Sequence, residues 1–96
     1  MVIAKFSGSY KSTVVNVELV LDMIDPTKDD NTTVMDIRAN DTAAEQELFH
    51  AIKRIPSSKT ALIAFATAND LNLLYDDNKG HTGVWYDAEN SVSVSS

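Results

Sequence analysis

The chain has 96 residues, enough for one domain, and it has no cysteine, which excludes disulfides and thiolate metal sites. Eight Lys and Arg against fourteen Asp and Glu give a net charge of −6, which disfavours direct binding to nucleic acid or to anionic membranes. No apolar run approaches the ~20 residues of a membrane span, and the first residues lack a signal-peptide pattern, so we expect a cytoplasmic protein.

Alternating apolar residues predict three strands in the first part of the chain. One strand begins at Val2 and ends before a Ser-Gly-Ser turn candidate at residues 7–9. The clearest pattern covers residues 15–23, where apolar side chains recur at every second position, as in a strand with one buried face. Residues 25–31 form a polar loop that contains a proline, and residues 33–39 alternate again. Consecutive strands of this kind favour an antiparallel meander.

A helix is predicted over residues 42–55. Asp41 or Thr42 can cap it, and Glu45 follows Thr42 at the spacing of a capping box. Pro56 ends the pattern, because proline cannot continue a helix. The apolar side chains fall on one stripe at helical spacing: Ala44, Leu48, Ala51, Ile52 and Ile55.

The second half of the chain is less regular. Residues 59–67 are apolar on both faces, which predicts a central strand covered on both sides. Weak alternation predicts a strand over residues 71–75, with a short helix over 69–76 as the alternative. Residues 84–86 are typical of a strand, and residues 91–96 of an edge strand or a frayed tail.

These elements predict one α+β domain over residues 1–96. We expect a mainly antiparallel sheet of five to seven strands, with one main helix, at about 42–55, packed on one face. This order of elements is shared by many unrelated proteins and implies nothing about function.

Catalytic and metal-binding signatures are absent from the sequence. It contains no G-x-S-x-G elbow and no glycine-rich phosphate loop, so we expect neither a cofactor nor catalytic residues. Asp76, Asp77 and His81 share one loop and are a weak candidate for a divalent metal site, although a polar turn explains the same residues. The loop with Asp25 and Asp29 lacks the glycine and the glutamate of a calcium-binding loop.

The aspartates of two loops are the candidate partner-binding residues. If the loops converge in space, they form one negative surface that favours a basic partner; whether they converge depends on strand order, which the sequence does not reveal. A solvated polar loop is the alternative explanation. Tyr86 joins the candidates because tyrosine is enriched in binding hot spots. The set is Asp25, Asp29, Asp30, Asp76, Asp77 and Tyr86.

The function that these observations favour is a small non-enzymatic protein-binding domain of the inhibitor, immunity or accessory type, which docks on a basic partner. The main alternative is a structural or self-assembling subunit that forms homo-oligomers. A homodimer through a sheet edge is a further expectation, with Val92 and Val94 on the candidate edge. The third alternative is a small metal-dependent hydrolase.

Overall fold

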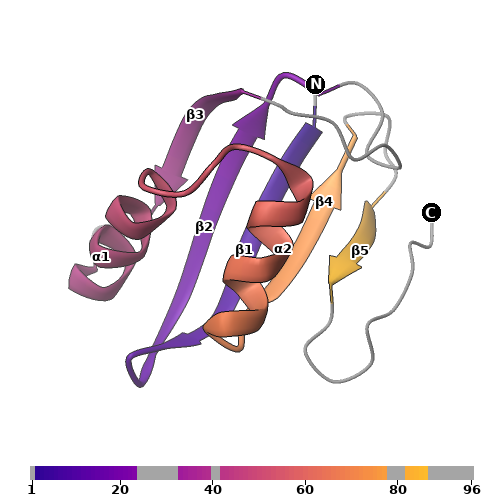
Figure 1. Ribbon diagram of the computed structural model, residues 1–96. Coiled ribbons are helices and arrows are strands. Elements are labelled where there is room, and N and C mark those ends of the chain that lie inside the picture. The colour runs from indigo at the N-terminus through magenta and orange to yellow at the C-terminus, as the bar shows by residue number, and fades with distance from the viewer. Residues whose placement is uncertain (1, 24–32, 40–41, 78–81, 87–96) are drawn as a thin grey trace.

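The computed structural model describes residues 2–23, 33–39, 42–77 and 82–86 (Figure 1). Its five strands form one sheet in the order β3-β2-β1-β4-β5, and every neighbouring pair is antiparallel. With two helices, the fold is α+β, as the sequence predicted. In chain order the elements are β1 (Val2–Tyr10), β2 (Thr13–Leu21), β3 (Val34–Ala39), α1 (Ala43–Ile52), α2 (Lys59–Ala68), β4 (Asn72–Asp76) and β5 (Thr82–Tyr86).

The β1–β2 hairpin is longer than the sequence pattern indicated. The two strands pair without interruption along nine residues each, and the turn between them consists of Lys11 and Ser12, with φ of 52° and 66°. Positive φ at both positions characterises the tight turn that matches the twist of a hairpin. The predicted turn at residues 7–9 is therefore wrong. Gly8 lies inside β1 with φ of 136°, and a Cβ there would lie 3.3 Å from the side chain of Leu71.

The sheet is a meander only over its first three strands. After β3 the chain forms both helices and returns as β4 on the free side of β1, so the N-terminal strand is the central one. Both helices cover the same face of the sheet, α1 against β2 and β3 and α2 against β4 and β5 (Figure 1). No helix among the described residues is long and apolar enough to cross a membrane.

The α1 helix follows its sequence signals. Thr42 is its N-cap, and the Thr42 hydroxyl accepts a hydrogen bond from the Glu45 N–H at 3.2 Å. Regular helix ends at Ile52, three residues before the predicted end, because the next N–H groups bond three residues back: Arg54 N to Ala51 O at 3.1 Å and Ile55 N to Ile52 O at 3.3 Å.

The predicted central strand at residues 59–67 is wrong, because this segment is helix α2. The Ser58 side chain caps its start by accepting from the Ala61 N–H at 3.2 Å. At its end Asp70 adopts φ of 55°, and the Leu71 N–H donates to the Ala66 carbonyl at 2.9 Å, as in a Schellman motif. A run that is apolar all round cannot distinguish a buried strand from a helix by periodicity. The strand predicted at 71–75 is confirmed as β4.

The hydrophobic core lies between the sheet and the two helices. Val17, Leu19, Leu48 and Ile52 are buried in it, and Ile63 is half-buried at its margin. Phe6 of β1 packs edge-to-face on Phe65 of α2, with ring centroids 5.6 Å apart. The other buried apolar residues that join this core are Val2, Ala4, Val15, Leu21, Met23, Leu62, Ala66, Leu71, Leu73, Tyr75 and Trp85.

Candidate functional site

The structure places three of the six predicted partner-binding residues, one of them by its backbone alone. Asp76 is the last residue of β4, and Asp77 follows it directly. Tyr86 is the last residue of β5, but its side chain lies outside the described part of the structure. Also outside the described residues are Asp25, Asp29, Asp30, His81 and the C-terminal segment 91–96.

Strand order determines where the two acidic connections begin and end. β2 and β4 are both antiparallel to β1 and lie on either side of it. β2 therefore ends at Leu21, opposite Val2, and β4 ends at Asp76, opposite Ile3. The connections that follow β2 and β4 leave from the same end of the sheet, at the start of β1 (Figure 1). We call this the acidic end.

Most of the net charge of the chain belongs to these two connections. Residues 22–33 and 76–81 contain six aspartates and two lysines, which is −4 of the total −6. Asp22 holds the first connection at its base: its Oδ1 accepts from the Thr33 N–H at 2.8 Å, and its own N–H donates to the Thr33 carbonyl at 3.1 Å. Asp22, Asp76 and Asp77 are the described aspartates of these two connections.

Several charges elsewhere are neutralised by near neighbours. Lys5 lies 3.8 Å from Glu18 across β1 and β2, and Lys11 lies 2.8 Å from Glu47, which ties the hairpin turn to α1. The hydrogen bond to the Glu47 carboxylate, and then its charge, raise the pKa of Lys11. These exposed pairs contribute little to stability, and each sets a positive charge beside a negative one.

Glu45 is the one buried charged side chain among the described residues, and its contacts are structural. Its Oε1 accepts from the Thr42 hydroxyl at 2.7 Å, and its Oε2 accepts from the Asn16 N–H at 2.8 Å. β3 pairs with β2 only as far as Val17, so the carboxylate takes the place that a β3 carbonyl would otherwise occupy beside Asn16. Glu45 thereby anchors α1 to the sheet.

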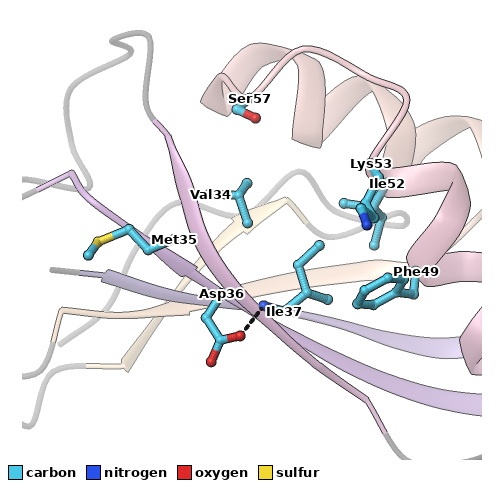
Figure 2. Close-up of a pocket in the computed structure, with 8 residues that line it drawn as sticks. All are labelled: Val34, Met35, Asp36, Ile37, Phe49, Ile52, Lys53 and Ser57. Carbon is cyan, nitrogen blue, oxygen red and sulfur yellow. Dashed lines mark hydrogen bonds between the residues drawn. The ribbon is translucent and has the colours of Figure 1, made fainter.

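A groove between β3 and α1 is a feature that sequence reasoning missed. It has a volume of about 340 Å³, and Figure 2 shows its lining: Val34, Met35, Asp36 and Ile37 from β3, Phe49, Ile52 and Lys53 from the α1 side, and Ser57 beyond the helix. The apolar stripe of α1 and the alternation of β3 were both visible in the sequence. That these two elements meet at the margin of the sheet depends on strand order, which the sequence does not reveal.

The described residues form no assembled metal site. No group of three or more His, Asp or Glu side chains among them could hold a metal ion, and His81 of the weak metal candidate lies outside their range. Comparison of the chain with protein-family models, with curated proteins and with solved structures found no match.

Proposed function

We propose that the chain is a small protein-binding domain of the inhibitor, immunity or accessory type, which docks by its acidic end on a partner with a basic surface. The observation that carries this proposal is the strand order. Because of this order, two acidic connections that are distant in sequence leave the sheet from the same end.

Electrostatics give the physical reason. Acidic side chains that lie close together in a free protein repel one another, and a partner that supplies counter-charges relieves this repulsion. A field of this kind acts mainly on the rate of encounter, because complementary charges steer two proteins together before they touch. Lysines 5 and 11 each have an acidic partner, so they oppose this field only weakly.

The test is affinity capture from a lysate of the cells that make the protein, with two charge-reversed variants. Asp77→Lys changes the acidic end, and Glu47→Lys makes the same change in charge on α1. We expect wild type and Glu47→Lys to retain the same basic protein, and high salt to release it. We expect Asp77→Lys to lose it while keeping its circular dichroism spectrum.

Two results would count against the proposal. One is that no protein is retained by wild type above the background of the bare resin. The other is that Asp77→Lys and Glu47→Lys retain the same protein equally, since the acidic end would then contribute no more than any other surface.

A further inference from the structure

The residues that line the groove between β3 and α1 belong to neither of the two acidic connections, although Val34 directly follows the first of them. The floor of the groove is apolar and comes from two elements, with Val34 and Ile37 of β3 facing Phe49 and Ile52 of α1 (Figure 2). Ile52 is buried beneath the groove, and the other three are half-buried, so apolar surface stays accessible. Apolar side chains with a few polar groups around them, in a volume of about 340 Å³, are features that the groove shares with binding sites on proteins.

The backbone beside the groove belongs to an edge strand. β3 is the last strand of the sheet, and the Asn16 N–H, bound by Glu45, marks which residues of β2 face the β3 side. By the alternation of an antiparallel ladder, Val20 pairs through its hydrogen bonds with Asp36, and the polar groups of Ile37 point outward. An outward edge is where an extended peptide can add as a further strand.

Asp36 occupies this edge in the free protein. Its Oδ1 accepts from the outward Ile37 N–H at 2.9 Å, and its Oδ2 lies 3.3 Å from the Arg38 Nε. The carboxylate therefore satisfies a donor that an added strand would satisfy with a backbone carbonyl. Such side-chain protection limits edge-to-edge association, but it is exchangeable because Asp36 is exposed.

A bulge adds an adaptable apolar side chain to the same strand. Leu21 pairs with Val34 and Val20 with Asp36, so Met35 has no partner on β2. Its side chain is 59% exposed, one of the two large exposed hydrophobic residues among those described. Bulges re-aim side chains at functional positions, and methionine adapts to varied apolar partners.

The charge at the rim of the groove determines which charge on a bound partner is favoured. Asp36 is already paired with Arg38, whereas Lys53 takes part in none of the ion pairs found among the described residues. The Lys53 ammonium lies 5.1 Å from the centre of the Phe49 ring, directly beside the groove. The unneutralised charge of the groove is therefore positive, although the chain as a whole is negative.

We propose that this groove binds an extended peptide segment of a partner protein, in which a bulky apolar side chain has a carboxylate within two residues of it. The segment pairs with the outer edge of β3, and its carbonyl replaces Asp36 at the Ile37 N–H. Its apolar side chain enters the groove between Ile37 and Phe49, and its carboxylate binds Lys53.

The test is selection of random ten-residue peptides displayed on phage, with the whole chain as bait. We expect the enriched peptides to combine a bulky apolar residue with a nearby Asp or Glu, and to shift the backbone amide resonances of β3 and α1. Lys53→Glu should lower the affinity for a synthetic copy of the best peptide about tenfold or more. Lys59→Glu is the matched control, because Lys59 lies over the Trp85 ring, outside the groove, and should change binding less than twofold.

A second variant tests the role of the edge. Asp36→Ala frees the Ile37 N–H, so we expect it to bind the same peptide several-fold more tightly. A proline at the centre of the peptide should abolish binding, because it removes the N–H that pairs with β3.

Four results would overturn the proposal: no enrichment over that obtained with Lys53→Glu as bait, enrichment of basic peptides, amide shifts confined to other surfaces, or a peptide that binds as a helix. Formation of a dimer through β3, measured by sedimentation, would also overturn it, since a second copy of the chain would then cover the groove. None of these results depends on the acidic end.

Discussion

Replacement of Glu45 by alanine should destabilise the domain strongly, although the residue lies on a surface helix. The carboxylate accepts from the Thr42 hydroxyl at 2.7 Å and from the Asn16 N–H at 2.8 Å. A hydrogen bond to a charged group contributes about 1.5–3 kcal/mol, and both bonds here are partly buried, so the lower value applies to each. We therefore expect Glu45→Ala to lower the free energy of unfolding by about 3 kcal/mol, out of the ~5–15 kcal/mol of a typical domain.

The assay is urea unfolding followed by far-UV circular dichroism, with thermal unfolding as a second measurement. A loss of ~3 kcal/mol corresponds to a fall in Tm of about 12–24 °C for a domain of this size. Gln46→Ala is the matched control, because Gln46 is exposed on the same turn of α1, and it should change stability by less than ~0.5 kcal/mol. Equal stability of Glu45→Ala and Gln46→Ala would refute the anchoring role of this carboxylate.

Three further predictions concern the β1–β2 turn, the close approach of Gly83 to the Tyr75 ring, and pH. Ser12→Gly should raise stability by about 0.5–1 kcal/mol in urea unfolding, because glycine relieves the strain of φ at 66°; a loss of stability would contradict the turn geometry. Gly83→Ala should lower the Tm and change the near-UV spectrum, because a Cβ there would lie 2.6 Å from the Tyr75 ring; an unchanged spectrum would contradict that contact. Contact with Glu47 raises the pKa of Lys11 in the folded protein. The ion pair therefore stabilises the fold below pH 10.5, and this stabilisation is lost as pH rises through the folded pKa. The difference in Tm between wild type and Lys11→Met should vanish above that pH, and a difference that persists would contradict the pairing of Lys11 with Glu47.

Strand and helix patterns with a clear period were predictable from the sequence. The alternation before Met23 and over residues 33–39 located β2 and β3, and the pairing of Thr42 with Glu45 located the start of α1. Each of these elements has one side that is more buried than the other, so the polarity of its side chains follows the period of the element, two residues in a strand and about 3.6 in a helix.

Two local predictions, the strand at residues 59–67 and the turn at residues 7–9, were wrong. In both segments the amino-acid composition does not indicate the structure that forms. Residues 59–67 are apolar on both faces, and only the caps at Ser58 and Asp70 mark the segment as a helix. Residues 7–9 contain a glycine that lies inside β1 with φ of 136° and close to the Leu71 side chain, while the true turn at Lys11 and Ser12 contains no glycine at all.

The candidate sites were predictable to different degrees. The acidic connections were visible in the sequence, but their common origin at one end of the sheet depends on β4 pairing with β1. The groove could not be predicted, since it requires both the edge position of β3 and the placement of α1 beside it. Contacts between elements that are far apart in the sequence leave no local pattern in the chain.

The most direct test of the proposed function is the association rate constant with the captured basic partner, measured by stopped flow at about 20 mM and about 500 mM salt. We predict that the rate for wild type and for Glu47→Lys falls at least about tenfold at high salt, and that Asp77→Lys associates at least about threefold more slowly than both at low salt. A wild-type rate that does not depend on salt, or equal rates for Asp77→Lys and Glu47→Lys, would contradict docking by the acidic end.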